Sequence, residues 1–530
     1  MIKFENVSFG FPDKDLYNDI SFEIEDGDHA VLIGSNGTGK STLIDLLLHE
    51  ERYTYDGKIT LSDTGRIGYV PQFVKHEKED TTVFDFLKKP FTEIQKKQDE
   101  LCLLMAKGEN LDKLYEEYQK SLDEMDSVDG YNADTNILKM LSLSGIEKIK
   151  DLELSKISGG EFKLVSIIGN MLLKPHLLIM DEPDVFLDFE NIIGLTKLIN
   201  EYKGTVLTVT HSRLLLSQCF NRILHIENTK LQEFPGTFAE YNDFLLDTKV
   251  EMYASAVSFD EFIEIQETLI EKIRKKTELN PDPKKGRQLK ARVTYLRKLK
   301  DMRGEDPFLD NGNYRFSFTP YEPDRDDVII DVKDYALSYD GLILSDVGFT
   351  VKEGEHVALV GSNGTGKSSL LRDIYDMYVK QHGEESIGYF RQIYESDTSE
   401  NMSGGELNIK RLKELSGRDL KVLLLDEPTS HLGTYAQLAL EKALREYKGT
   451  VIFVSHDFFT ITGIADRILL LEDSTLRETS ARQYRKSIYR KYFESDIFEA
   501  ERKRTEREIR VINLLKHGKY VEAKEELKKQ

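Results

Sequence analysis

The octapeptide GSNGTGKS occurs twice in this sequence of 530 residues, at Gly34–Ser41 and again at Gly361–Ser368. Each copy follows a short apolar run, AVLIG or HVALVG, and precedes a helical pattern. A strand, a glycine-rich turn and a helix in this order point backbone N–H groups at phosphate, while the lysine reaches further phosphate oxygens and the serine hydroxyl binds Mg²⁺. We therefore predict two phosphate-binding glycine loops, one in each half of the chain.

The order of motifs around the two glycine loops is also repeated. The first half continues with GYVPQ ending at Gln72, ISGGE at 157–161, LLIMDEP at 177–183 and TVLTVTH ending at His211. The second half continues with GYFRQ ending at Gln392, MSGGE at 402–406, VLLLDEP at 422–428 and TVIFVSH ending at His456. Short apolar strands that alternate with helical patterns are typical of a parallel sheet buried on both faces. The sequence therefore predicts two tandem α/β domains.

The halves differ in the length of one connection. Gln72 and Ser158 are separated by 85 residues, whereas Gln392 and Ser403 are separated by ten. The added stretch at about 90–126 has apolar residues at helical spacing, which predicts a helical arm inserted in the first half. An ordinary helical subdomain explains part of the same stretch equally well.

Two carboxylates follow an apolar strand in each half, Asp181 with Glu182 and Asp426 with Glu427. The carboxyl edge of a parallel sheet is where ligands bind, which favours a functional interpretation over a solvated surface pair. Phosphoryl transfer needs positioned charge, so the aspartate is expected to hold Mg²⁺ and the glutamate to polarise the attacking water.

With SGGE between a glycine loop and an apolar strand ending in Asp-Glu, both halves resemble ATP-binding-cassette (ABC) ATPases over about 400 residues. The resemblance implies that ATP on one glycine loop is closed over by the SGGE signature of the other half. One site would join Lys40 to Ser403, Gly404 and Gly405, and the other would join Lys367 to Ser158, Gly159 and Gly160.

The same resemblance assigns the remaining site residues. The catalytic residues would be Glu182 and Glu427 with the switch histidines His211 and His456. The Mg²⁺ ligands would be Ser41, Gln72, Asp181, Ser368, Gln392 and Asp426. ATP-contacting residues of the first half would be Phe11, Gly34, Ser35, Asn36, Gly37, Thr38, Gly39, Lys40, Ser41, Thr42, Gln72, Ser158, Gly159, Gly160, Glu161 and Asp181. Those of the second half would be Tyr339, Gly361, Ser362, Asn363, Gly364, Thr365, Gly366, Lys367, Ser368, Ser369, Gln392, Ser403, Gly404, Gly405, Glu406 and Asp426.

Two positions depart from a simple match. Phe11 and Tyr339 correspond to the aromatic residue that stacks on adenine, but Phe9 competes with Phe11 for this role, and a core role is the alternative. After Asp-Glu-Pro the family usually ends a loop in Leu-Asp, and the second half has Gly433 where the first has Asp188. The two sites are therefore expected to hydrolyse ATP at unequal rates.

Composition narrows the class of ABC protein. The sequence shows neither a signal peptide nor an apolar run long enough to span a membrane, so a cytoplasmic protein without a membrane partner is expected. The two cysteines lack CxxC spacing, which argues against the zinc of DNA-repair relatives and the iron–sulfur domain of the ribosome-recycling relative. The ATPase subunit of an importer is the less favoured alternative.

A basic segment stands out in a chain with a net charge of −21. Residues 271–303 contain thirteen Lys or Arg and four acidic residues, a net charge of +9. Such a concentration favours contact with phosphate backbones, although a solvated charged coiled coil is the alternative. The residues expected to contact RNA are Lys275, Lys276, Lys284, Lys285, Arg287, Lys290 and Arg292. Helices of about 30 residues would carry a tip at about 280–288 well away from the ATPase body.

Fused cassettes, an arm and a basic linker resemble the ABC-F family. The implied organisation is an ABC ATPase domain at 1–244, a helical hairpin linker at 245–325, a second, trimmed ABC domain at 326–480 and a basic helical C-terminal extension at 481–530. That extension is expected to touch ribosomal RNA or to pack a dimer, although a monomer is favoured.

The resemblance also implies a ribosomal function. The implied partners are the 70S ribosome, with its large-subunit rRNA, and peptidyl-tRNA. By this resemblance the protein would occupy the tRNA exit site, direct its linker toward the peptidyl-transferase centre and confer resistance by displacing antibiotics, like the resistance proteins of Gram-positive bacteria. A housekeeping translation factor is the alternative.

Overall fold

The computed structural model describes most of the chain. The residues outside the description are 1, 13, 62–64, 75–79, 108–109, 256–258, 280–282, 302–315, 320–322, 324–326, 339–341, 393–403, 431, 493–502, 504–506, 508–509, 512–513, 515–518 and 529–530. Two compact units are present. We call residues 25–29 and 61–210 the arm unit, and residues 2–24, 30–60 and 211–530 the main unit. Among the described residues, no helix is both long and apolar enough to cross a membrane.

The arm unit contains three parallel strands, β5 (Ile67–Val70), β6 (Leu177–Asp181) and β7 (Thr205–Val209), in the order β5-β6-β7. All five residues of β6 and of β7 are buried, as expected for strands covered on both faces. Its helices are α2 (Val83–Met105), α3 (Leu111–Ser127), α4 (Ala133–Ser144), α5 (Gly159–Leu172) and α6 (Phe189–Glu201), with short 3₁₀ turns at Gly130–Asn132, Glu147–Ile149 and Leu154–Lys156.

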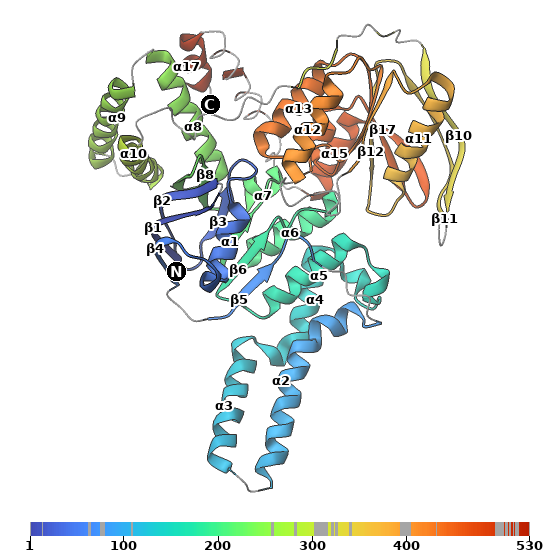
Figure 1. Cartoon of the computed structure of the whole chain (residues 1–530). Helices are drawn as coiled ribbons and strands as arrows, with labels where there is room; N and C mark the ends of the chain where they lie inside the picture. Colours follow the sequence, from blue (N-terminus) through green and yellow to red (C-terminus); the bar gives the residue numbers. More distant parts are fainter. Residues whose placement is uncertain are drawn as a thin grey trace. The chain divides into compact units, whose positions relative to one another are not determined.

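Helices α2 and α3 form the hairpin that extends from the arm unit (Figure 1). Gln98 is buried between them, and its Nε2 donates to the Ser121 carbonyl oxygen at 2.9 Å. Thr82 caps α2 by accepting from the Asp85 N–H. The insertion found in the first half is thus a pair of antiparallel helices with its own buried polar contact.

The second half supplies a six-stranded sheet to the main unit, in the order β13-β14-β15-β12-β16-β17. Its strands are β12 (His356–Gly361), β13 (Ile387–Phe390), β14 (Val422–Asp426), β15 (Thr450–Val454), β16 (Arg467–Glu472) and β17 (Thr475–Ser480), and only β17 is antiparallel to its neighbour. Its helices are α11 (Lys367–His382), α12 (Gly404–Ser416), α13 (Thr434–Glu446), α14 (Phe458–Ile464) and α15 (Ala481–Tyr492). The hairpin β10 (Val328–Ser338) and β11 (Leu342–Lys352) shares a hydrophobic core with this sheet.

The first half supplies two groups of strands to the main unit. β1 (Ile2–Phe11), β2 (Lys14–Ile24) and β4 (Asp56–Leu61) form one sheet, while β3 (His29–Ile33), β8 (Arg222–Glu227) and β9 (Lys230–Pro235) pair in the same way as β12, β16 and β17. The associated helices are α1 (Lys40–Leu48) and α7 (Arg213–Gln218), with a 3₁₀ turn at Glu50–Arg52. The strand trio β5-β6-β7 of the arm unit likewise pairs as β13-β14-β15 does. The internal repeat read from the sequence is therefore repeated in the strand pairings.

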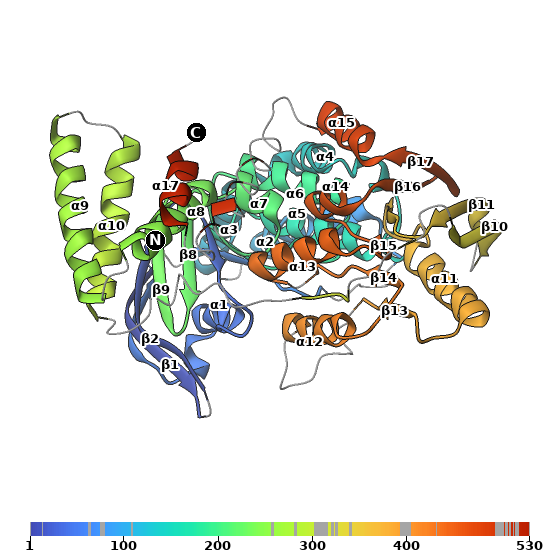
Figure 2. The ribbon, with the colours of Figure 1, turned by 90° about the horizontal axis from the view of Figure 1, so that it is seen from above.

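The segment expected to form the linker, 245–325, contains most of α8 (Phe238–Ser255), with α9 (Phe259–Leu279) and α10 (Pro283–Asp301), and α9 and α10 lie side by side (Figure 2). The expectation of helices of about 30 residues is wrong, because α9 has 21 residues and α10 has 19. Pro283 begins α10, a position that proline suits because the first turn of a helix needs no N–H partner. Residues 283–288 of the expected tip are therefore helical.

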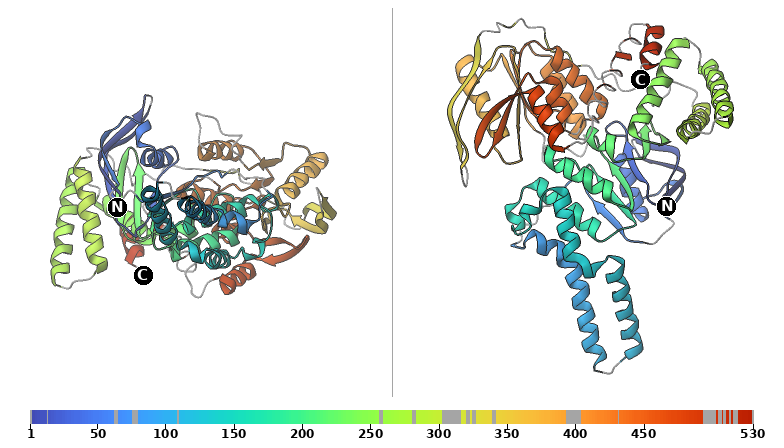
Figure 3. Two further views of the ribbon diagram at one scale, coloured as in Figure 1. Left: turned by 90° about the horizontal axis from the view of Figure 1, so that it is seen from below. Right: turned by 180° about the vertical axis from the view of Figure 1, so that it is seen from behind.

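The described residues of the C-terminal extension that follow α15 pack on α8 (Figure 3). Val511, Ala523 and Leu527 join Leu246 and Val250 in one hydrophobic cluster, with α17 at Tyr520–Lys528. The segment is therefore anchored inside the main unit at the start of the linker.

Candidate functional site

The two glycine loops have the same geometry. Lys40 Nζ donates to the carbonyl oxygens of Gly34 at 3.0 Å and Ser35 at 2.9 Å, and Lys367 Nζ donates to those of Gly361 at 2.8 Å and Ser362 at 2.7 Å. Gly37 and Gly39 have φ of 76° and 92°, which side chains rarely adopt, and Gly364 and Gly366 repeat these values closely at 81° and 84°. The repeated sequence thus folds into two equivalent phosphate cradles at the starts of α1 and α11.

The aromatic residues beside the first glycine loop divide into core and surface positions. Phe9 contacts Phe11, Tyr17 and Tyr53, whereas Phe11 is 47% exposed at the end of β1. Tyr17 is buried, and its hydroxyl donates to the Gly39 carbonyl oxygen. Phe11 is therefore the ring available for stacking on a base, while Phe9 packs in an aromatic cluster. Tyr339, the expected counterpart of Phe11 in the second half, lies outside the described residues.

In the arm unit, the end of β6 meets the segment after β5. Gln72 Nε2 donates to Glu182 Oε2 at 2.6 Å, and Asp181 is buried at the last position of β6. Lys163 of α5 donates from Nζ to the carbonyl oxygens of Gln72 at 2.8 Å and Glu182 at 2.7 Å. Three residues that are far apart in the sequence thus meet at one point.

In the main unit, the end of β14 meets the segment after β15. His456 Nε2 lies 3.5 Å from Glu427 Oε1, and the His456 N–H donates to Glu427 Oε2 at 3.4 Å. Burial and the neighbouring Asp426 carboxylate raise the pKa of Glu427 to about 8, and burial together with Lys367 lowers the pKa of His456 to about 3. The imidazole is therefore neutral near pH 7.

Both candidate catalytic glutamates have an unusual backbone. Glu182 has a φ of 44° and Glu427 a φ of 51°, in the left-handed region that bulky residues avoid. Each is held there by a hydrogen bond from its own N–H, to Val209 O at 2.8 Å in one half and to Val454 O at 3.0 Å in the other. Strained backbone of this kind is concentrated at functional sites.

The second half offers a donor set that fits Mg²⁺. Burial raises the pKa of Asp426 at the end of β14, while the Ser368 hydroxyl in the first turn of α11 favours the ionised form of this carboxyl group. Asp426 Oδ1 is buried and has no hydrogen-bond partner within the described ranges, which leaves it available to a cation. A hydroxyl and a carboxylate beside a phosphate cradle are the ligands Mg²⁺ takes in nucleotide sites.

Within the main unit, parts of the first and second halves approach one another at the first glycine loop. A Cβ atom added to Gly37 would lie 3.1 Å from Glu406 Oε1 of the second signature and 3.4 Å from Lys14 Nζ. In addition, His211 Cε1 would lie 4.0 Å from a Cβ atom on Gly433. The signature and the Gly433 loop of one half therefore lie beside the glycine loop and the histidine of the other. Gly404 begins α12, whereas Ser403 lies outside the described residues.

The first signature, in the arm unit, caps a helix. Ser158 accepts from the Glu161 N–H at 3.2 Å, and Glu161 Oε2 accepts from the Ser158 N–H at 2.8 Å, so SGGE forms a capping box at the start of α5. Gly159 would meet nothing within 4 Å if it carried a Cβ atom. The motif thus presents an open helix N-terminus, which favours an anion.

Asp188 of the first half caps a helix, and Gly433 at the equivalent position of the second half does not. Asp188 caps α6 by accepting from the Asn191 N–H at 3.0 Å, whereas Gly433 begins α13 with no side-chain cap. The same glycine lies beside His211. The difference found in the sequence therefore changes both a helix end and a neighbour of the switch histidine.

The basic linker residues do not form one free surface. Arg292 is only 7% exposed, pairs with Asp247, donates to Gln266 Oε1 at 3.1 Å and lies over the Phe244 ring. Its assignment to RNA contact is corrected, because its charge is engaged inside the linker. Lys275 and Lys290 are exposed. The side chains of Lys276, Lys284 and Lys285 lie outside the described part of the linker.

Helix α10, which carries the expected linker tip, also lies closer to the first half than expected. Arg287 Nη2 is 3.7 Å from Glu240 Oε1 at the start of α8, and Lys298 at the other end of α10 donates to the Leu231 carbonyl oxygen in β9. Both ends of α10 therefore contact the first half, and the expected wide separation of the tip from the ATPase body is wrong for the described residues.

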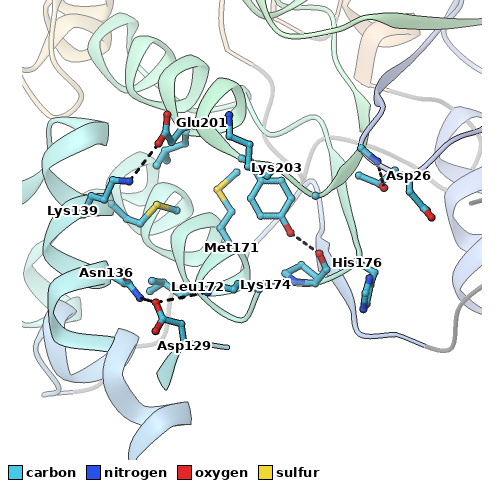
Figure 4. Close-up of a pocket in the computed structure, with 17 residues that line it drawn as sticks. Asp26, Asp129, Asn136, Lys139, Met171, Leu172, Lys174, His176, Glu201 and Lys203 are labelled. Carbon is cyan, nitrogen blue, oxygen red and sulfur yellow. Dashed lines mark hydrogen bonds and ion pairs between the residues drawn. The ribbon is translucent and has the colours of Figure 1, made fainter. Parts of the chain in front are cut away.

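The arm unit also contains a pocket of about 700 Å³, which lies away from the predicted chemistry (Figure 4). It is lined by His176 and Thr205, at the amino ends of β6 and β7, whereas Asp181 ends β6 at the opposite edge. Its rim charges pair among themselves, with Lys139 3.3 Å from Glu201. This pocket is distinct from the candidate nucleotide site.

Two contacts were not expected from the sequence. Arg213, two residues after His211, pairs with Glu441 and Asp457, and Lys163 lies between Gln72 and Glu182. Alignment of the two halves carries a signal for the second contact, because Lys163 corresponds to Asn408 and Asp184 to Thr429. One half thus has a lysine and an aspartate where the other half has neutral residues.

Two equivalent phosphate cradles, each in a half with a strand ending in Asp-Glu and an SGGE helix, define an ABC-type ATPase with two cassettes. A family model described as ABC transporter matches residues 17–185 and 344–389. The uncharacterized ABC transporter ATP-binding protein YfmM of Bacillus subtilis is 27% identical over 516 residues, which cover 86% of this chain and 95% of that protein.

A second relative is named for a role in translation. The energy-dependent translational throttle protein EttA of Escherichia coli K12 is 27% identical over 517 residues, which cover 87% of this chain and 90% of that protein. A solved structure of RNase-L inhibitor covers 92% of both chains at 17% identity with a TM-score of 0.50, which supports the fold. The relatives are ABC-F-type proteins, so the predicted resemblance to that family is confirmed.

Proposed function

We propose that this protein is an ATP-driven translation factor that binds ATP at two composite sites between its halves and binds the ribosome through its linker. The observation that carries the ATPase part is the approach of Glu406 to Gly37. A signature helix beside the glycine loop of the other half is what closure over a shared nucleotide requires. The approach of Gly433 to His211 supports the same arrangement.

Hydrolysis follows from the groups at each strand end. Glu182 or Glu427 orients a water for in-line attack on the γ-phosphorus of ATP, the bond to the β–γ bridging oxygen breaks, and ADP and phosphate leave. The Gln72 amide holds Glu182 from one side, and His456 holds Glu427 in the other half. Lys40 and Lys367 bind phosphate oxygens. Ser368 with Asp426, and Ser41 with Asp181 in the first half, would hold Mg²⁺, which would supply positive charge against the phosphates.

Two observations support the ribosome as partner: the exposed positive charge of α9 and α10, and the similarity to a relative named for translation. Lys275 and Lys290 expose positive charge on two adjacent helices of an otherwise acidic protein. Such residues contact phosphate backbones without reading sequence. The name of the relative EttA points to translation. By resemblance to the ABC-F family, the bound protein occupies the tRNA exit site, and its linker approaches the peptidyl-transferase centre beside peptidyl-tRNA.

The ATP-trapped variant Glu182→Gln with Glu427→Gln tests this proposal. It is expected to co-sediment with 70S ribosomes in ATP, and the association should weaken steeply between about 50 and 200 mM salt because phosphate contacts release counterions. The parent protein in ADP is the control for weak binding. Recovery of the variant with membranes instead of ribosomes contradicts the proposal and favours the importer alternative.

We further propose that the bound protein displaces antibiotics near the peptidyl-transferase centre, either directly through its linker or by shifting the peptidyl-tRNA. Expression in a sensitive bacterium should raise the inhibitory concentration of lincosamides, pleuromutilins or streptogramin A. The Glu182→Gln, Glu427→Gln variant serves as the control without turnover. Unchanged inhibitory concentrations together with ATP-dependent slowing of translation contradict the resistance role and favour the housekeeping role.

A further inference from the structure

Lys163 connects three motifs of the first half inside the arm unit. It lies near the start of α5, five residues after the signature Ser158, and is only 3% exposed. Its Nζ donates to the carbonyl oxygens of Gln72 and Glu182 at 2.8 and 2.7 Å. A single ammonium group therefore ties the signature helix to the backbone of the candidate Mg²⁺-sensing glutamine and of the candidate catalytic glutamate.

The charge of Lys163 is balanced locally. Burial lowers the pKa of Lys163 to about 8, although Asp184, Glu182 and Asp181 favour its ammonium form. Asp184 itself accepts from the Thr210 hydroxyl, which fixes the carboxylate at the end of β7. Lys163 and Asp184 are thus groups of opposite charge that attract one another within the arm unit.

The second half has a neutral pair at the same positions. Asn408 follows Ser403 by five residues, and Thr429 follows Glu427 by two, as Lys163 and Asp184 do in the first half. Asn408 Nδ2 donates to the Ser430 carbonyl oxygen at 2.6 Å, a neutral bond to the loop after the glutamate. Hydrogen bonds from a charged donor are about twice as strong as neutral ones, so the first half has the stiffer connection.

We propose that Lys163 couples the two ATP sites in one direction, by transmitting signature closure to the hydrolytic residues of the same half through its bonds to the Gln72 and Glu182 carbonyl oxygens. The inference rests on the proposed function, in which Ser158 contacts ATP held by Lys367 while Gln72 and Glu182 act on ATP held by Lys40. ATP binding at the second glycine loop pulls on α5, and Lys163 passes this displacement to Gln72 and Glu182. Lys163 is a positioning residue, because it touches the backbone of these groups and not the reacting atoms.

Single-site turnover measures this coupling. In Glu427→Gln, only the site of Lys40 and Glu182 hydrolyses, while the second glycine loop still binds ATP. In Glu427→Gln with Lys367→Ala, that second ATP is lost. We define the coupling ratio as the turnover of the first variant divided by that of the second. We expect a ratio of about five or more, the usual lower range of energetic coupling between sites.

Introducing the neutral pair, Lys163→Asn with Asp184→Thr, should bring the coupling ratio close to one. A merely structural defect lowers both turnovers and leaves the ratio unchanged. The matched control is Asn408→Ala in the second half, which should preserve the ratio. If the exchanged pair does not fold, as judged by thermal unfolding, Lys163→Gln in the same two backgrounds decides the question.

Hydrogen exchange gives a readout independent of hydrolysis. In Lys40→Ala, ATP binds only at the second glycine loop, and it should still protect amides of residues 67–72. This protection should disappear when Lys163→Asn and Asp184→Thr are added to the same background. An unchanged coupling ratio and unchanged protection overturn the inference while leaving the composite sites intact. Absence of ATP hydrolysis in the parent protein contradicts the proposed function instead.

Discussion

Arg213 donates from Nη2 to the carboxylates of Glu441 and Asp457, and Asp457 directly follows the candidate switch histidine His456. Arg213 itself follows the other candidate switch histidine, His211, by two residues. Within the main unit, the two histidine segments are therefore joined by a buried ion pair. The Arg213 guanidinium also lies 4.8 Å from the centre of the Phe459 ring.

Replacing Arg213 by alanine should destabilise the main unit. Arg213 is 6% exposed and Glu441 5%, so the substitution leaves buried carboxylates without their cation. Loss of one partner of such a pair costs about 3–5 kcal/mol of unfolding free energy. Urea unfolding followed by circular dichroism checks this. The control is Lys442→Ala, whose partner Glu446 is exposed, and it should cost less than about 1 kcal/mol. Equal unfolding of both variants would contradict the structural role of Arg213.

The two glutamates should carry ATP turnover. Glu182→Gln with Glu427→Gln keeps the shape of both side chains but removes the carboxyl groups that orient water. Turnover should fall about a hundredfold or more, measured as phosphate release. Binding of a fluorescent ATP analogue should be retained, because Lys40 and Lys367 are unchanged. Parent-like turnover in this double variant would show that other groups polarise the water.

Neighbouring basic residues of α10 should have separable roles. Arg292→Ala removes a buried guanidinium and should cost about 1–3 kcal/mol of unfolding free energy, since Gln266 loses its donor and Asp247 its cation. Lys290→Ala should change stability by less than about 0.5 kcal/mol, since Lys290 is exposed. Instead it should reduce the slope of log ribosome affinity against log salt by about one. Equal salt slopes for Lys290→Ala and the parent would remove Lys290 from the RNA-contacting set.

Lys298 should make the stability of the main unit depend on pH. Burial lowers its pKa from near 10.5 to about 8 in the folded protein, so between these values the unfolded chain binds more protons. Stability then rises with pH: the penalty is fully present below pH 8 and fades toward pH 10.5. The unfolding free energy of the parent, relative to Lys298→Met, should rise by about 1–3 kcal/mol from about pH 7 to about pH 10. The control is Lys290→Met at an exposed position, for which the difference in unfolding free energy from the parent should not change with pH. A pH-independent difference for Lys298→Met would contradict the lowered pKa of Lys298.

The sequence predicted the cassettes because their chemistry needs fixed residues in a fixed order. Glycines with positive φ, a lysine at the first helical position and a carboxylate pair after a buried strand leave few alternatives, and the structure has all three in both halves. The positions of Lys40, Glu182 and Glu427 could therefore be read before any coordinates.

The linker was predicted less well, because helical periodicity does not specify where a helix packs. Arg292 and Lys290 are both basic and two positions apart, yet only Lys290 faces solvent. Net charge predicted an RNA surface for both. Burial depends on Asp247, Gln266 and Phe244, which are distant in the sequence and whose contact with α10 no local pattern reveals.

The packing of Val511 and Ala523 against Leu246 and Val250 has a consequence for biosynthesis. A ribosome makes the chain from its amino end, so the apolar face of α8 emerges on the order of tens of seconds before the residues that cover it. During this interval the nascent first half carries an open hydrophobic face at the root of its linker. Completion of that small core must therefore be one of the last events in folding, and a nascent chain stalled before Val511 is the form most exposed to chaperones and to aggregation.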